Sequence, residues 1–362
     1  MVGAGRTGLG MELQVSIPYQ AKRAVESTER LPPVHCSDPP AGFMSLILSI
    51  IVPVFGLIAL GYGAGRARLL PNSAPEALSA FVFVVAMPMV LFRTLATARF
   101  DAGNPLALWI SYFAGVIVVF GLGMLVARRL GRSDRRAAVI AGVGASFSNL
   151  VFVGVPVATL AYGQEGLSVL AMLLAVHLPL MMMGSTLLIE RAALLDARED
   201  GSETGQRLPV ADIALRVGRN LVKSPLILGI FAGLAFRLTG LPLAGPLGEI
   251  VTLMAGAAGP VALFSLGLTM TRFRVRGDMP VALAISALAL VVQPVVVLGV
   301  GALLLPREWL ALTVAMAACP SGVNAYLFAT YFRSGEGIAA TAIVMTTALS
   351  AVSLTVWLLL LA

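Results

Sequence analysis

The chain of 362 residues is 58% hydrophobic and only 12% charged, with a mean hydropathy of +0.93. Soluble proteins are about one quarter charged, so this composition excludes an ordinary soluble protein and indicates an integral membrane protein. The net charge of +7 comes largely from arginines in the predicted loops, where they set membrane topology, and we expect no nucleic-acid partner.

Residues that commonly bind metals or act as nucleophiles are few in this sequence. Cys36 and Cys319 offer no disulfide framework, and two histidines without clustered Cys, Asp or Glu argue against a metal site. The sequence has no glycine-rich Lys-Ser/Thr phosphate loop, so ATP is not the direct energy source. We therefore expect neither a metal nor a cofactor.

Residues 1–43 differ from the rest of the chain, because they are polar, rich in Pro and Gly, and lack helical periodicity. They contain no apolar run of the kind that a signal peptide needs. Residues 3–8 spell GAGRTG, a dinucleotide-binding pattern, but no predicted strand precedes it and we attribute it to chance. We expect a disordered extension, or a true translation start at Met44.

Ten apolar ranges follow, each long enough to cross a bilayer as a helix. They are residues 45–65, 75–95, 105–127, 137–162, 166–190, 221–239, 247–270, 279–305, 308–332 and 337–361. A polar stretch at 191–220 separates the first five from the last five, and we expect it to be a cytoplasmic linker. The predicted fold class is an all-α integral membrane protein with ten transmembrane helices, multi-pass through the lipid bilayer.

The second set of five ranges repeats features of the first. Pro53 and Pro225 each fall early in the first range of their half, and PMVLF at 88–92 corresponds to PVALF at 260–264. Because each half holds an odd number of spans, the second half must be inverted in the membrane. Inverted repeats are a secondary-transporter architecture. The two predicted five-helix repeats span residues 44–190 and 221–362.

The fourth and ninth ranges each carry small and polar residues in the middle, together with a proline. Residues 146–156 read SFSNLVFVGVP and residues 319–326 read CPSGVNAY. Pro156 and Pro320 remove a backbone donor, so we expect both helices to be broken and to cross at mid-membrane. Two interrupted helices at corresponding places are the best sequence-level indication of a transporter's binding site.

Asn149 and Asn324 are the first candidate substrate ligands, since a carboxamide offers two donors and an acceptor. The half-helix N-termini would add positive dipole ends, and no acidic residue lies deep in any range, so the site suits a small organic anion. The alternative is that each asparagine only caps its own broken helix. Their matching positions favour the binding site. The neighbouring candidates are Ser148, Ser321 and Gly322.

His177 is a further candidate for the substrate site, because an ionisable residue at membrane depth is functional by default. Histidine titrates near neutrality, which leaves proton coupling open. The alternative is a neutral histidine that donates to a backbone carbonyl freed by Pro179. Gln293, which precedes Pro294, has the same two interpretations, and we favour a structural role for it.

Most lysines and arginines fall in the loops that follow the odd-numbered ranges. By the positive-inside rule, that face of the protein is cytoplasmic. Both termini are then predicted to lie outside the cytoplasm, in a protein of the cell (inner) membrane.

These segments resemble those of a known family. Residues 44–62, MSLILSIIVPVFGLIALGY, resemble the start of the bacterial auxin efflux carrier family, and 148–156 and 319–326 resemble its two crossover motifs. The resemblance covers 44–362 and points to a bacterial malonate-permease-like member. It implies the ten-helix inverted-repeat fold, a homodimer through a scaffold of the first, second, sixth and seventh helices, and a moving transport domain formed by the others.

The leading interpretation is a secondary transporter of small organic anions that works by elevator-type alternating access. Its cargo would be carboxylates such as malonate, or auxin-like weak acids. The alternative is a non-transporting membrane receptor or sensor that uses the same crossover pocket, although the stretch at 191–219 is too short to fold alone as an output domain. An intramembrane enzyme comes third, because the sequence shows no catalytic carboxylate pair, Ser-His pair or metal set.

Overall fold

The computed structural model describes residues 41–97, 104–131, 133–199, 215, 219, 223–273 and 279–361. The predicted extension lies outside these residues up to position 40, and most of the predicted linker at 191–220 also lies outside them. The chain divides into a unit Met1–Met44 and a compact unit Ser45–Ala362. Everything below concerns the second unit.

The described residues form helices and no strand, apart from one isolated bridge pair, which confirms the all-α class. The α-helices are α2 (Ala41–Arg66), α3 (Ala74–Phe81), α4 (Met87–Thr97), α5 (Pro105–Arg129), α6 (Arg135–Ser146), α7 (Val155–Glu199), α9 (Pro225–Leu238), α10 (Gly245–Met270), α11 (Met279–Ala287), α12 (Gln293–Leu304), α13 (Arg307–Ala317), α14 (Asn324–Phe332) and α15 (Glu336–Leu361). Three π-helical turns complete them: η1 (Val82–Ala86), η2 (Leu150–Gly154) and η3 (Leu288–Val292).

Within the described residues, seven helical runs are long and apolar enough to cross a membrane, judged by length and composition. They are Leu48–Arg66, Ala74–Thr97, Pro105–Arg129, Leu150–Asp196, Gly245–Met270, Met279–Leu304 and Glu336–Leu361. The apolar helix α9 is shorter. The chain is thus a multi-pass helical protein, and the count of ten spans stays a prediction.

Each π-helical turn ends two residues before a proline: Pro88, Pro156 or Pro294. A proline ring clashes with the carbonyl four residues earlier, and the wider π turn relieves that clash. For Pro294 this carbonyl belongs to Leu290, whose oxygen accepts from Ser353 Oγ and from Trp357 Nε1, both at 2.9 Å. These prolines therefore reshape helices without ending them.

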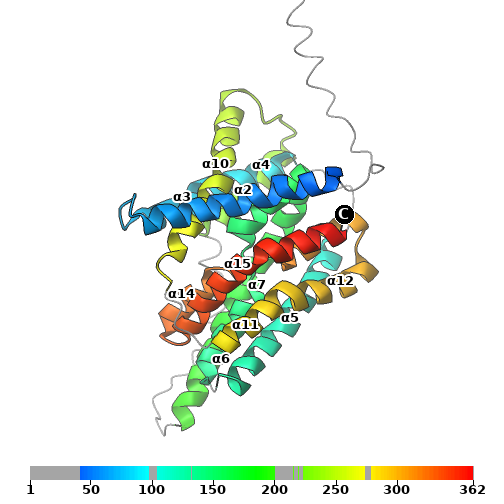
Figure 1. The fold of residues 1–362 in the computed structure, drawn as a ribbon. Coiled ribbons are helices and arrows are strands. Elements are labelled where there is room, and N and C mark those ends of the chain that lie inside the picture. Colours follow the sequence, from blue (N-terminus) through cyan, green and yellow to red (C-terminus); the bar gives the residue numbers. More distant parts are fainter. Residues whose placement is uncertain are drawn as a thin grey trace, which may run out of the picture. The chain divides into compact units, whose positions relative to one another are not determined.

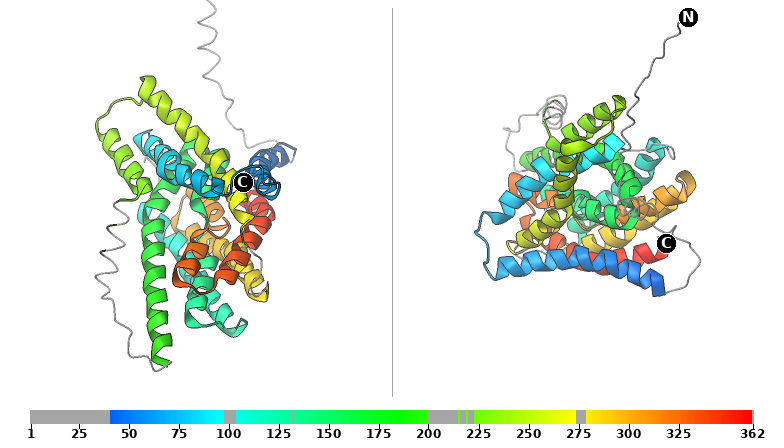
Figure 2. Two further views of the ribbon diagram at one scale, coloured as in Figure 1. Left: turned by 90° about the vertical axis from the view of Figure 1, so that its left-hand side faces the viewer. Right: turned by 90° about the horizontal axis from the view of Figure 1, so that it is seen from above.

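The helices form two groups, which Figures 1 and 2 both show. The α4 group consists of α2, α3, α4, α9 and α10, and the α5 group consists of α5, α6, α11, α12, α13, α14 and α15. The segment formed by η2 and α7 contacts both groups: η2 and α7 pack on α10, while α7 also packs on α5, α6 and α13. The junction between the groups therefore runs along η2 and α7.

Two helix crossings inside the α4 group depend on glycine. A Cβ on Gly61 of α2 would lie 2.1 Å from the Phe264 carbonyl oxygen of α10. A Cβ on Gly233 of α9 would lie 2.5 Å from the Phe92 carbonyl oxygen of α4. Small residues let membrane helices approach this closely, so both crossings exclude any larger side chain.

Gly61→Ala should destabilise the protein by about 1–3 kcal/mol, because the added methyl group forces α2 and α10 apart. Gly63→Ala is the matched control on the same helix, since a Cβ there meets nothing within 4 Å. Thermal unfolding of detergent-purified protein measures both variants. Equal melting temperatures for the two variants would contradict the packing argument.

Candidate functional site

Two non-helical segments meet in the interior of the second unit. Residues 147–149 lie between α6 and η2, and residues 318–323 lie between α13 and α14. We call them the crossing segments. Ser148 and Ser321 form an antiparallel bridge pair between them. Each crossing segment therefore supplies hydrogen-bond partners that the other lost when its helix ended.

Two backbone hydrogen bonds hold this bridge. Asn149 N donates to the Pro320 carbonyl at 2.8 Å, and Gly322 N donates to the Phe147 carbonyl at 2.7 Å. A Cβ on Gly322 would lie 3.0 Å from the same Phe147 oxygen, so glycine is favoured at this position. Pro320 contributes a carbonyl acceptor here, and because proline has no backbone N–H, it leaves no donor unpaired.

Ser321 is turned into the protein interior and is only 1% exposed. Its hydroxyl donates to the Gly144 carbonyl, and its backbone N–H donates to Thr346 Oγ1 at 3.1 Å. Both bonds tie the second crossing segment to neighbouring helices. Ser321 thus holds the crossing in place.

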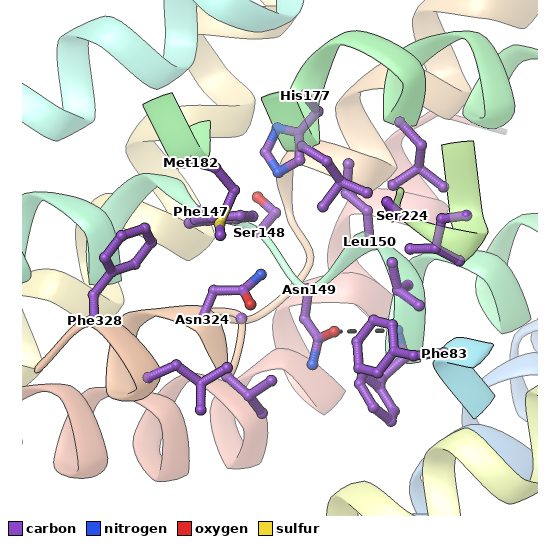
Figure 3. A pocket seen from close by; sticks show the side chains of 18 of the residues that line it. Phe83, Phe147, Ser148, Asn149, Leu150, His177, Met182, Ser224, Asn324 and Phe328 are labelled. Atoms are coloured by element: carbon purple, nitrogen blue, oxygen red, sulfur yellow. Dashed lines mark hydrogen bonds between the residues drawn. The ribbon is translucent and has the colours of Figure 1, made fainter. Parts of the chain in front are cut away.

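A cavity of about 690 Å³ adjoins the crossing segments (Figure 3). Five of the sequence-predicted site residues line it: Ser148, Asn149, His177, Gly322 and Asn324. Ser321, Pro156 and Pro320 are not among its lining residues. The interruption at 147–149 precedes Pro156, which follows a helical turn.

Asn149 combines the two roles that its sequence position suggests. Its Oδ1 accepts from Phe152 N at 3.1 Å and so caps the start of η2. Its Nδ2 makes no hydrogen bond to any described residue, although the side chain is only 4% exposed. A buried amide donor without a partner is costly, which makes Nδ2 a candidate ligand for an acceptor in the cavity.

Asn324 begins α14, and no side-chain hydrogen bond caps that helix. Figure 3 shows Asn149, in the first crossing segment, and Asn324, which directly follows the second, among the side chains that line the cavity. Among the described residues, the backbone N–H groups of Val323 and Asn324 also find no acceptor. The start of α14 therefore offers unpaired donors together with a free carboxamide.

His177 on α7 is fully buried at 0% exposure. Its ring lies 5.4 Å from that of Tyr112, 6.3 Å from that of Phe113 and 5.0 Å from that of Phe147, measured between centroids. The His177 ring faces the backbone of Ser148, but neither imidazole nitrogen forms a hydrogen bond of good geometry within the described chain, and a bond to a carbonyl freed by Pro179 is not made. His177 is thus a second unpartnered polar group in the cavity wall.

Two polar residues, Gln293 and Tyr112, do not line the cavity but lie against Ser148, which does. Gln293 Nε2 donates to Ser148 Oγ at 3.4 Å, and its Oε1 stays unpaired within the described chain. The Tyr112 hydroxyl faces both residues without forming a hydrogen bond of good geometry. Sequence reasoning missed Tyr112, because a single tyrosine in an apolar helix carries no signal of its own.

Most of the remaining lining is apolar, apart from Thr186, Glu190, Ser224 and Tyr331, and the cavity is nearly free of charge. Aromatic side chains include Phe83, Phe147, Phe152 and Phe328. No lysine or arginine is among the lining residues, and Glu190 supplies the one charged side chain. The described residues contain no group of three or more His, Cys, Asp or Glu that would hold a metal ion. Recognition of a charged ligand here must rely on amides and helix dipoles.

Comparison with known proteins identifies related sequences. A model of the family described as membrane transport protein matches residues 46–358. The chain is 26% identical to the "Putative malonate transporter" of Rhizobium meliloti (strain 1021), over 86% of this chain and 95% of that protein. It is 28% identical to an "Uncharacterized transporter" of Methanothermobacter thermautotrophicus, over 87% and 97%. It is 24% identical to the "Lysosomal cholesterol signaling protein" of Mus musculus, over 64% of this chain and 27% of that protein.

The two asparagines should differ in their effect on stability. Asn149→Ala should cost about 1 kcal/mol, because it removes the cap of η2, whereas Asn149→Ser keeps a capping oxygen and should cost little. Asn324→Ala should leave the melting temperature unchanged, since no hydrogen bond is lost. Thermal unfolding of the three variants tests this order. A loss at Asn324 equal to that at Asn149→Ala would mean that both residues are structural caps.

Proposed function

The chain belongs to the membrane transport protein family, and from this premise we propose that it is a secondary transporter of small organic anions. This membership confirms the resemblance to the auxin efflux carrier family. The comparisons point to a multi-pass membrane transporter rather than an enzyme. The cargo, the site and the transport mechanism are our proposal.

The observation that carries the proposal is the pair of free carboxamides at the crossing segments. Asn149 Nδ2 and the Asn324 side chain both line the cavity and lack partners within the described chain. The unpaired N–H groups of Val323 and Asn324 adjoin the second of these side chains, at the start of α14. Amide donors and a helix N-terminus together favour an anion such as a carboxylate.

The cavity lining supports a carboxylate with an apolar body over a dicarboxylate. A second carboxylate would need a second set of donors, but most of the wall is aromatic or aliphatic and no cation lines it. An aromatic weak acid would place its ring against Phe147, Phe152 or Phe328. Malonate, named in one relative, is the competing cargo.

Several features support the ten-helix inverted-repeat fold as part of the proposal. The run Leu150–Asp196 has 47 residues, about 70 Å if straight, against a hydrocarbon core of about 30 Å. Gly163 interrupts it, with φ 60° and ψ −145°. Two crossings of this run (the first together with α6), one crossing by the shorter helix α9 and one by the pair α13 and α14 would bring the spans to ten.

The glycine crossings of the α4 group support the same symmetry. Gly61 follows Pro53 at the same spacing as Gly233 follows Pro225, and their contact partners Phe264 and Phe92 stand at matching places after a proline. The two helix pairs therefore correspond to each other under an inverted repeat. We propose that the α5 group, with η2 and α7, moves against the α4 group in an elevator-type cycle.

Three further features belong to the proposal. The face with most arginines is cytoplasmic in the inner membrane, with both termini outside. A homodimer forms through α2, α4, α9 and α10, which expose large apolar side chains such as Leu60, Phe231 and Leu253. His177 remains the candidate for proton coupling.

A membrane sensor that uses the same cavity is the second candidate function. The match to a mouse protein named for signalling favours it. That match spans 27% of the mouse protein, so most of the mouse protein has no counterpart in the match. Measured flux separates the two candidates, because a sensor binds the ligand without moving it.

Flux of labelled carboxylates into proteoliposomes should be saturable for the unmodified protein. Asn324→Ala and Asn149→Ser should each lower it roughly tenfold or more, because each removes a hydrogen bond to a charged ligand. Asn104→Ala is the matched control, since Asn104 caps α5 and lines neither this cavity nor the one described below. Undiminished flux in both site variants would remove the crossing segments from the binding site.

Substrate preference follows from the apolar wall. Indole-3-acetate should be transported with a higher kcat/KM than malonate or succinate, because the wall can bury a ring but cannot pair a second carboxylate. Competition by each unlabelled acid against the transported one measures the order. A clear preference for malonate would contradict the aromatic-acid assignment while leaving the carrier intact.

A further inference from the structure

A second cavity, of about 320 Å³, lies between the α4 group and the start of α7. Helices α2, α4, α10 and α7 all contribute to its wall, and it shares no lining residue with the first cavity. The segment formed by η2 and α7 lines both cavities in turn. Its residues 150–152 line the first cavity, and several residues within 155–160 line the second. The second cavity is therefore a separate space at the same junction.

Residues without long side chains keep this space open. Gly256 and Gly259 lie one turn apart on α10 and both line the cavity. A Cβ on Gly256 would meet nothing within 4 Å, and a Cβ on Gly259 would make ordinary contact with Pro156 at 3.6 Å. The volume of the second cavity thus depends on glycine at these two positions, and a larger side chain at Gly256 would fill the cavity without a backbone clash.

One cation lines this mostly apolar cavity, whose other polar side chains are Thr94, Thr159 and Gln164. Arg93 of α4 is partly buried, and its guanidinium makes no ion pair or hydrogen bond with a described residue. Its neighbour Thr94 also lines the cavity, is 2% exposed, and has a hydroxyl without a hydrogen bond in the described chain. A planar guanidinium next to a free hydroxyl suits a carboxylate, which accepts two hydrogen bonds from an arginine.

The remaining wall suits an apolar body. Leu57, Leu160 and Leu263 line the cavity together with three prolines. A ligand with one charged end and one apolar end would bury its body there while Arg93 holds the charge.

We propose that this cavity is a second binding site, for a single-chain carboxylate with a compact apolar body. Its anionic group would pair with Arg93 and Thr94. An anionic lipid carries the same chemistry, but its two acyl chains exceed a space at the lower end of the usual range of about 300–1,000 Å³ for ligand cavities. The site is independent of the crossing segments, and its occupancy does not require that the protein transports anything.

The test measures binding of labelled octanoate to the purified full chain by scintillation proximity. All variants carry Asn324→Ala, which removes a carboxamide proposed as a ligand in the first cavity. Saturable octanoate binding should remain in Asn324→Ala alone and should weaken at least tenfold when Arg93→Gln or Gly256→Leu is added. Arg66→Gln and Gly299→Leu are the matched controls, because Arg66 is exposed and lines neither cavity, and Gly299 faces open space.

Three results would overturn the proposal, given that elution volume and melting temperature show folded variants. The first is loss of all octanoate binding in Asn324→Ala alone, which would assign the ligand to the first cavity. The second is unchanged binding after both Arg93→Gln and Gly256→Leu. The third is displacement of octanoate by phosphatidylglycerol at lower concentration than by decanoate, which would identify the occupant as a lipid. None of these results depends on measured flux, so the proposed transport function stands or falls separately.

Discussion

The exchange of two backbone hydrogen bonds between the crossing segments is the constraint on which the rest of the site depends. Helices that end inside a membrane protein leave N–H and C=O groups that water cannot reach. Here Asn149 N pairs with the Pro320 carbonyl and Gly322 N pairs with the Phe147 carbonyl. This pairing fixes two chain segments, far apart in sequence, face to face and leaves a few donors free at one place.

Those free donors define the chemistry of the first cavity. The carboxamides of Asn149 and Asn324 are neutral, as are the helix-start N–H groups of α14, so an anion can be held without a fixed counter-charge. A neutral site costs less to leave empty than an unpaired buried cation, which matters for a carrier that must bind and release. The second cavity differs, because the charged side chain of Arg93 lines it.

Pro156 acts differently from the expectation that it breaks its helix, whereas Pro320 lies inside the non-helical segment 318–323. Pro88, Pro156 and Pro294 each follow a π-helical turn, and the helix continues through them. The residues that lack helical geometry, 147–149, come before Pro156 and include two of its polar neighbours. These three prolines therefore mark widened turns, and the interruption at 147–149 coincides with side chains that offer the backbone alternative partners.

Length and apolar composition alone determined the membrane class and the all-α fold, because a bilayer admits few other backbone solutions. The repeated Asn motifs also identified Asn149 and Asn324 as residues to examine. Only the tertiary structure decided that Ser148 faces the cavity while Ser321 bonds to Gly144, and that Tyr112 and Gln293 stand behind the site. It alone revealed the space beside Gly256. These features depend on which helices meet, and contacts between residues far apart in the chain leave no local pattern in one sequence.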